Sequence, residues 1–285
     1  MATRTRIRLE PLRIDGHEVG RVLITGASSG IGAALARVFA SHGHRLTLVA
    51  RRRGQLAALA AELEREHNVD VQVIVQDLAK ASGPATVAKA VEASGEGVGI
   101  LVNNAGVIEV GPFVRSAHEK IVGLVDLNVR ALTALTSLLV PPMVERGFGR
   151  VLNVASLAAF QPVPSMAAYA ASKAYVLALS EALSEELKDT GVTVTALCPG
   201  LTDTAMVSDI KAGSKAAASL PQQLVSDPAD VAVAAYRALM AGRAVVVPGL
   251  PNQITAAWSQ ITPRWLTRYV TGVAARQGDW FRSAP

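Results

Sequence analysis

Short apolar runs alternate with longer amphipathic stretches along most of the chain. Strands that are apolar on both faces are typical of a parallel sheet covered by helices on each side. The pattern predicts strands at residues 21–25, 45–50, 70–76, 99–103, 150–155, 192–197 and 244–248. It predicts helices near residues 30–42, 53–67, 82–94, 115–146, 166–189 and 228–241. We therefore expect an α/β fold, a doubly wound parallel sheet of seven strands with helices on both faces.

Composition narrows the classes of partner. Half of the 285 residues are hydrophobic, which suits one α/β domain, and only 4% are aromatic, which argues against a base-stacking nucleic-acid surface. The net charge of +5 comes from the ends: residues 1–13 and 263–285 each hold four arginines and one acidic residue, +3 apiece, which leaves −1 for the rest. We therefore expect no nucleic-acid partner.

Cysteine and histidine usage gives no sign of a metal or of a disulfide. The single cysteine, Cys198, ends the apolar run VTVTALC and is expected to be a buried strand residue in a protein of the reducing cytoplasm. The five histidines lack metal-ligand spacing, so no metal is expected. The N-terminal stretch has no apolar signal segment, and we expect no membrane-spanning helix because no apolar run of about 18 residues is free of charges or helix breakers.

A glycine-rich turn directly follows the first predicted strand and opens a helix. In Thr-Gly-Ala-Ser-Ser-Gly-Ile-Gly, residues 25–32, Gly26 permits a sharp turn, Gly30 lets a pyrophosphate approach the backbone, and Gly32 allows close packing of the helix on the sheet. The unpaired N–H groups at the helix N-terminus would face the phosphates. A nucleotide site is predicted here, although such turns also serve as ordinary connections.

The end of the second strand bears on which dinucleotide binds. It has Leu-Val-Ala-Arg-Arg-Arg where an acidic residue would bind the 2′-hydroxyl of NAD. A guanidinium pairs with a 2′-phosphate, so NADP(H) is favoured over NAD(H), with Arg51 placed first, Arg52 beside it, and Ser28 or Ser29 adding a hydroxyl. The alternative for Arg52 and Arg53 is a solvated cluster that begins a surface helix.

The strongest candidate for chemistry is Tyr169-Ala-Ala-Ser-Lys173, thirteen residues after Ser156. A tyrosine and a lysine four apart lie on one helix face, about 6 Å apart along the axis, and the ammonium is expected to lower the pKa of the phenol. A serine at the end of the preceding strand would hold a carbonyl oxygen while the tyrosine transfers a proton. Taken alone, this spacing also occurs on ordinary amphipathic helices.

The glycine turn, Asn-Asn-Ala-Gly at 103–106, Ser156, Tyr169-x-x-x-Lys173 and Pro199-Gly200 occur in one order that closely resembles the short-chain dehydrogenase/reductase family over roughly residues 20–248. The resemblance implies a single Rossmann-type domain and hydride transfer between a nicotinamide cofactor and a carbonyl or secondary alcohol. It implies that Tyr169 is the general acid/base and that Ser156 polarises the substrate oxygen. It implies that Lys173 lowers the tyrosine pKa and binds the nicotinamide ribose, and that Asn128 holds a water in a proton relay towards the lysine.

The same resemblance implies the cofactor contacts. The expected cofactor-binding residues are Gly26, Ser28, Ser29, Gly30, Ile31, Gly32, Arg51, Arg52, Asp77, Leu78, Asn104, Ala105, Gly106, Tyr169, Lys173, Pro199, Gly200, Thr202 and Thr204. Asp77 and Leu78 would contact the adenine, and Thr202 or Thr204 the carboxamide or the phosphates. Asn103 lies next to this set and could equally be a structural turn residue.

The two ends extend beyond the resemblance. We divide the chain into an N-terminal extension (1–20), a catalytic domain (21–250) and a C-terminal extension (251–285). The last of these mixes Trp258, Trp265 and Tyr269 with Arg264 and Arg268, and three roles stay open for it: a helix on a membrane surface, an oligomer contact, or a flap over the substrate pocket. The segment of about 203–226 is expected to be a lid.

The apolar residues that surround Ser156 and precede Tyr169 predict a hydrophobic carbonyl or alcohol substrate, of unspecified identity. Two alternatives remain: a non-catalytic NADP-binding regulatory protein, and an epimerase or dehydratase on the same scaffold. By resemblance alone, a homodimer or homotetramer is expected through the helices at 115–146 and 166–189.

Overall fold

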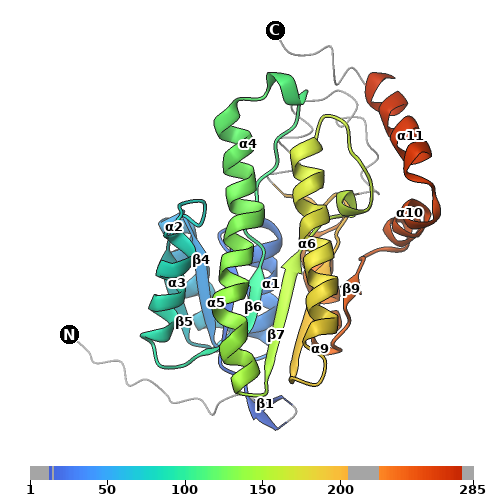
Figure 1. The fold of residues 1–285 in the computed structure, drawn as a ribbon. Helices are drawn as coiled ribbons and strands as arrows, with labels where there is room; N and C mark the ends of the chain where they lie inside the picture. Colours follow the sequence, from blue (N-terminus) through green and yellow to red (C-terminus); the bar gives the residue numbers. More distant parts are fainter. Residues whose placement is uncertain (1–12, 15, 205–224, 278–285) are drawn as a thin grey trace.

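The computed structural model describes residues 13–14, 16–204 and 225–277, and its centre is a parallel sheet in the order β5-β4-β3-β6-β7-β8-β9 (Figure 1). Every pairing in this seven-stranded sheet is parallel, as expected from the apolar runs. The order reverses between β3 and β6, which makes the sheet doubly wound. The strands are β3 (Arg21–Thr25), β4 (Leu46–Ala50), β5 (Val71–Val75), β6 (Val98–Asn103), β7 (Gly149–Val154), β8 (Val192–Leu197) and β9 (Val245–Val246).

Helices cover both faces of this sheet. Those that connect the strands are α1 (Gly30–Ser41), α2 (Arg53–His67), α3 (Gly83–Glu92), α4 (His118–Val125), α5 (Leu132–Glu145), α6 (Ala167–Glu186) and α9 (Pro228–Met240). On one face α1 contacts α2 and α9, and on the other α5 contacts α3, while α4 contacts α6. Each layer encloses its own apolar cluster, with Phe39 and Leu239 in the first and Leu135 and Met143 in the second. The predicted α/β fold is confirmed.

The long helix predicted over 115–146 is interrupted. A 3-10 turn, η1 (Phe113–Arg115), precedes α4, and a π-helical segment, η2 (Asp126–Ala131), separates α4 from α5. The whole stretch His118–Glu145 has a mean hydropathy of 1.4 and is long and apolar enough, by length and composition, to cross a membrane. It carries Asp126 and Arg130 and packs against α3, α6 and β6, so we interpret it as a helix of the α/β layer.

The two ends of the chain add elements that the strand pattern did not predict. In the leader, β1 (Arg13–Ile14) pairs antiparallel with β2 (His17–Glu18). After β9, which is shorter than the predicted 244–248, come α10 (Leu250–Ile261) and α11 (Arg264–Gln277). In Figure 1 this helical pair stands to one side of the sheet, beside the short η3 (Leu157–Phe160), which α10 contacts. Most of the predicted lid, 205–224, lies outside the described residues.

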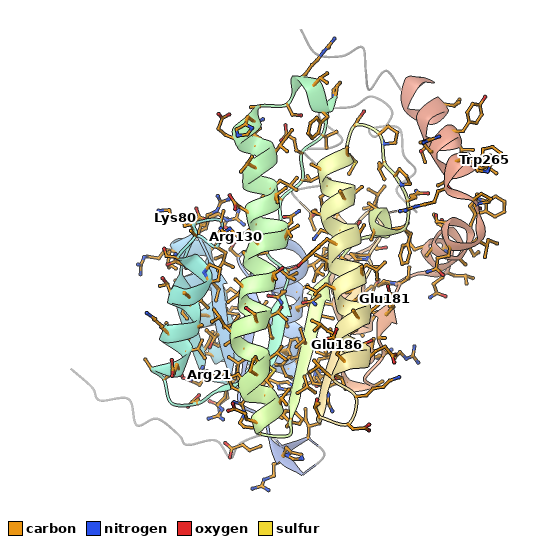
Figure 2. The ribbon with its side chains drawn as sticks, in the orientation of Figure 1. Arg21, Lys80, Arg130, Glu181, Glu186 and Trp265 are labelled. Carbon is orange, nitrogen blue, oxygen red and sulfur yellow. The ribbon has the colours of Figure 1, made fainter. Side chains whose placement is uncertain are left out.

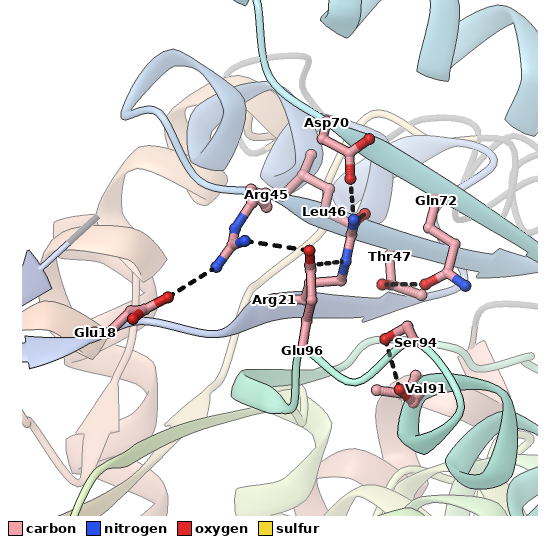
Figure 3. Close-up of polar contacts among 10 residues, drawn as sticks. All are labelled: Glu18, Arg21, Arg45, Leu46, Thr47, Asp70, Gln72, Val91, Ser94 and Glu96. Carbon is pink, nitrogen blue, oxygen red and sulfur yellow. Dashed lines mark hydrogen bonds and ion pairs between the residues drawn. The ribbon is translucent and has the colours of Figure 1, made fainter. Parts of the chain in front are cut away.

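An ionic network joins the amino ends of three strands (Figure 3). Arg21, only 6% exposed, pairs with Asp70 and with Glu96 (2.6 Å), and its Nη1 donates to the Leu46 carbonyl (2.8 Å). Arg45 pairs with the same Glu96 at 3.2 Å. The network fixes the starts of β3, β4 and β5 and leaves their carboxyl ends for the loops that form the site.

Candidate active site

A cavity of about 440 Å³ opens at the carboxyl ends of β3, β4, β6, β7 and β8. It collects almost every predicted site residue: Gly26, Ser28, Ser29, Gly30, Ile31, Arg51, Arg52, Asp77, Leu78, Asn104, Ala105, Gly106, Ser156, Tyr169, Lys173, Pro199, Gly200, Thr202 and Thr204 line it. Gly32 and Asn128 do not line the cavity but contact residues that do. Residues far apart in sequence thus share one cavity, as a dinucleotide and a second molecule require.

The glycine turn is packed against the loop after β6. Gly26 has φ +66°, and a Cβ there would lie 2.8 Å from the Ala105 Cα. A Cβ on Gly32 would lie 2.4 Å from the Asn104 amide nitrogen, and that amide donates to the Thr25 carbonyl (2.8 Å). Thr25, which our sequence reasoning missed, accepts at Oγ1 from the backbone N–H groups of Asn104 (2.9 Å) and Ala105 (3.0 Å). Its signal was a polar residue ending an apolar strand.

Arg52, and not Arg51, reaches the glycine turn. Its Nη2 donates to the Ser28 hydroxyl at 2.9 Å and to the Ser29 hydroxyl at 2.7 Å. Arg51 lines the same cavity, and Arg52 lies beside both serines two residues after the end of β4. Arg52 is thus the arginine that bonds the glycine turn, and the expectation that Arg51 comes first in binding a 2′-phosphate stays a prediction.

Asp77, which also lines the cavity, shapes the turn after β5. Its Oδ1 accepts from the backbone N–H of Ala79 at 3.0 Å, and the Ala79 carbonyl accepts from Arg130 at 2.6 Å. Figure 2 shows Arg130 reaching from the long helical stretch towards this turn, near Lys80. Leu78 is buried and also lines the cavity. Leu78 and Asp77 thus place an apolar and a polar side chain together in the cavity wall after β5.

Ser156, Tyr169 and Lys173 meet on the inner wall. Ser156 caps η3, with its hydroxyl accepting from the Ala158 N–H at 3.1 Å, and it also hydrogen-bonds Tyr169. The Lys173 Nζ donates to the Val154 carbonyl at 2.8 Å and lies 5.8 Å from the centre of the Tyr169 ring. Tyr169 and Lys173 are both more than nine-tenths buried. The three side chains can therefore act on one small molecule.

Burial is the main influence on the pKa values of Lys173 and Tyr169. Burial lowers the pKa of Lys173 from 10.5 to about 8, because desolvation disfavours the ammonium. Burial also raises the pKa of Tyr169, a rise that its hydrogen bond with Ser156 partly opposes. Desolvation of the phenolate is therefore the largest influence on the pKa of Tyr169, and the expectation that Lys173 lowers this pKa stays a prediction. Tyr169 is a protonated phenol, suited to giving a proton.

Asn128 makes a clamp from within the π-helical segment. Its Oδ1 accepts from the Val107 N–H and its Nδ2 donates to the Val107 carbonyl, both at 2.9 Å. The same Nδ2 donates to Ser172, the residue before Lys173, at 3.1 Å. Asn128 therefore holds the loop after β6 against α6, and a role in a water relay stays a prediction. Ser172 and Val107 were missed, because nothing in their local sequence marks them.

Two neighbours of the site are structural. Asn103 is buried away from the cavity, where its Nδ2 donates to Asn153 (2.9 Å) and to Thr136 (3.1 Å). Cys198 is fully buried at the end of β8, and burial raises the pKa of its thiol to about 12. Asn103 is thus structural, but as the last residue of β6 bonded to side chains and not as the turn residue expected, and Cys198 is buried as expected.

This fold and site define a class of protein: an α/β enzyme with a glycine-rich dinucleotide cradle beside a serine, tyrosine and lysine. The sequence matches the family model for short chain dehydrogenases over residues 20–215. The chain belongs to the short chain dehydrogenase family, whose members are NAD(P)-dependent dehydrogenases and reductases.

Individual relatives and solved structures support the same family. The chain is 37% identical to a short chain dehydrogenase of Pseudocercospora fijiensis (strain CIRAD86) over 193 residues, 67% of this chain and 62% of that protein. Among solved structures, the NADPH complex of a short-chain dehydrogenase from Sphingobium yanoikuyae is similar, with 36% identity, a TM-score of 0.75 and coverage of 91% of this chain and 94% of that one. The bulky-bulky ketone specific alcohol dehydrogenase from Comamonas testosteroni has 30% identity and a TM-score of 0.72, covering 94% and 98%.

Proposed function

We propose that this protein is an NADP(H)-dependent oxidoreductase that interconverts a carbonyl and a secondary alcohol on a hydrophobic substrate. The observation that carries the proposal is Arg52 bound to the Ser28 and Ser29 hydroxyls, in the cavity that also holds Tyr169 and Lys173. A guanidinium with two hydroxyls is a charge-assisted site for a phosphate. Similarity to a structure solved with NADPH supports this choice.

The cavity fits a dinucleotide, because its cradle is made of glycines whose added Cβ atoms would collide with neighbouring backbone or side chains. Gly26, Gly30 and the N-terminus of α1 would hold the pyrophosphate, Arg52 the 2′-phosphate, and Lys173 the nicotinamide ribose. When bound, the cofactor supplies or accepts the hydride.

The chain's own residues supply orientation and the proton. Ser156 holds the substrate oxygen with its hydroxyl, and Tyr169, protonated because of its raised pKa, delivers the proton to that oxygen in the reductive direction. Lys173, held on the Val154 carbonyl, is close to half charged near pH 8 and can resupply a proton to the tyrosine side of the cavity. Asn128 keeps the loop at Val107 in place beside it.

The part of the cavity near Ser156 and Tyr169 is apolar and indicates the substrate. Ile108, Leu157, Val163, Met166 and Leu201 line it, with Gln161 as a polar neighbour. A large uncharged ketone or alcohol matches such a wall. Similarity to an alcohol dehydrogenase described as specific for bulky-bulky ketones supports the same class.

We place the enzyme in the cytoplasm as a homodimer or homotetramer. Val122 and Val125 of α4, Leu138 of α5 and Tyr175 of α6 are large apolar side chains with 39 to 44% exposure on neighbouring helices. Such a patch supports association through these helices. Analytical ultracentrifugation of the wild type beside Leu138→Glu tests it, and a monomeric wild type would contradict it.

The deciding experiment compares NADPH and NADH consumption over a panel of ketones. We expect turnover of bulky apolar ketones with NADPH preferred, and Tyr169→Phe should lose at least 100-fold in kcat while still binding NADPH. Arg52→Ala should raise the KM for NADPH at least tenfold and leave that for NADH nearly unchanged. Arg53→Ala and Tyr175→Phe are matched controls outside the cavity. NADPH binding without oxidation across the panel would contradict the enzymatic proposal.

A further inference from the structure

The helix α10 is oriented with its large apolar side chains outward. Leu250, Ile254, Trp258 and Ile261 recur at helical spacing and are 63 to 78% exposed. The residues turned inward are small or polar, with Ala256 and Ser259 buried. A surface helix of a globular domain normally shows the reverse arrangement, with its apolar stripe against the core.

The outward stripe continues onto α11. Trp265 and Tyr269, four residues apart, are each 64% exposed, and Val270 is 57% exposed. Figure 2 shows Trp265 pointing away from the rest of the molecule. We call the seven residues Leu250, Ile254, Trp258, Ile261, Trp265, Tyr269 and Val270 the outer stripe. Seven large apolar side chains exposed on two consecutive helices indicate an interaction surface.

The charges within α10 and α11 have one sign. Arg264 and Arg268 are exposed on the same helix as Trp265 and Tyr269, and residues 250–277 contain no aspartate or glutamate. If the stripe met the same stripe of a second copy about a two-fold axis, neither arginine would find a carboxylate in it. Exposed tryptophan and tyrosine mixed with arginine instead match the interface of an anionic bilayer.

We propose that α10 and α11 dock on an anionic phospholipid membrane surface through the outer stripe. The aromatic and aliphatic side chains enter the boundary between head groups and acyl chains, while Arg264 and Arg268 contact lipid phosphates. The protein lies on the membrane and does not span it.

Docking there would bring the cavity close to the lipid. The inward Ser259 donates to Gln161 at 3.1 Å, and Gln161 lines the cavity. The inward Asn252 packs on Gly200, where an added Cβ would lie 2.5 Å from the Asn252 amide oxygen. The same helix thus carries the outer stripe on one side and supports the cavity wall on the other, so a membrane-dissolved substrate would have a short path to it. This last consequence rests on the proposed function, whereas the docking itself does not.

The test is sedimentation of the intact chain with phosphatidylcholine vesicles, with and without phosphatidylglycerol. We expect binding to the anionic vesicles that weakens with added salt. All three tryptophans, at 258, 265 and 280, lie in this part of the chain, so their emission should shift to the blue on binding. Trp258→Ser/Trp265→Ser should reduce partitioning at least tenfold, and Arg264→Gln/Arg268→Gln roughly thirtyfold on anionic vesicles.

Val233→Ser/Arg237→Gln, an exposed pair on α9, is the matched control and should bind vesicles like the wild type. Retained NADPH binding in each variant shows that the fold persists. Absence of sedimentation with anionic vesicles would overturn the proposal. So would an oligomer that the tryptophan substitutions dissociate, because the outer stripe would then be covered by protein. A wild type that binds anionic vesicles but reduces no ketone would contradict only the proposed function.

Discussion

Lys173 makes this protein less stable than an apolar residue would at the same position. The residue is 6% exposed, and burial lowers its pKa from 10.5 to about 8. At about 1.36 kcal/mol per pKa unit, the penalty on the charged form is roughly 3 kcal/mol. Lys173→Met keeps a side chain of similar length and removes the charge. It also leaves the Val154 carbonyl without the hydrogen bond from the Lys173 Nζ, at a cost of about 1 kcal/mol. The cofactor-free variant should therefore be about 2 kcal/mol more stable near pH 7.

The sign of the pH dependence separates this reasoning from simple repacking. Between pH 8 and 10.5 the unfolded state binds more protons at Lys173 than the folded state does, so wild-type stability gains as pH rises. By about pH 9.5 the advantage of the variant should have shrunk by roughly 2 kcal/mol, to near zero. The assay is urea unfolding of both proteins at several pH values. The contributions of the Cys198 thiol and the Tyr169 phenol largely cancel in the difference. A variant that is less stable at pH 7, or an advantage that does not change with pH, would refute the argument.

Three other predictions concern the frame around the site. Gly32→Ala places a Cβ 2.4 Å from both the Asn104 amide nitrogen and the Gly26 carbonyl oxygen. It should therefore lower the free energy of unfolding by about 1 to 3 kcal/mol and weaken NADPH binding. Thermal unfolding with and without NADPH measures both effects, and an unchanged melting temperature would argue against the tight packing. His44 is 1% exposed, and burial lowers its pKa from 6.5 to about 4. As the pH falls from about 7 to about 4.5, the free energy of unfolding of the wild type should therefore decrease by about 2 kcal/mol relative to that of His44→Phe. If the stabilities of the two proteins fell by the same amount over this pH range, the prediction would be contradicted. Arg21→Met removes the cation that Asp70 and Glu96 share and should lower the free energy of unfolding, measured in urea, by about 2 kcal/mol. The loss is smaller than for a fully buried ion pair because both carboxylates are over a third exposed. The control Arg37→Met breaks an exposed pair with Glu62 and should change the free energy of unfolding by less than about 1 kcal/mol.

Three features could not be predicted from the sequence, and each has a clear physical cause. The helix over 115–146 was predicted whole, yet Asn128 bonds both backbone groups of Val107 and the chain there widens into a π segment. This is a long-range interaction that helical periodicity does not contain. Arg51 was ranked above Arg52 because it directly follows the strand, and the sequence does not contain the contact of Arg52 with the two serines. The pKa of Tyr169 was predicted from one neighbour, and the sequence does not contain how deeply the phenol is buried.

What the sequence by itself determined is the part that repeats locally: continuous apolar runs gave the strands of the parallel sheet, the glycine turn gave the cradle, and the tyrosine and lysine four apart gave the shared helix face. These features depend on backbone geometry within a few residues. Only the tertiary structure decided which arginine meets the two serines, which way burial moves the pKa of the tyrosine and of the lysine, and that α10 turns its large apolar side chains outward. These outcomes depend on desolvation and on contacts between distant segments, which exist only once the chain has packed.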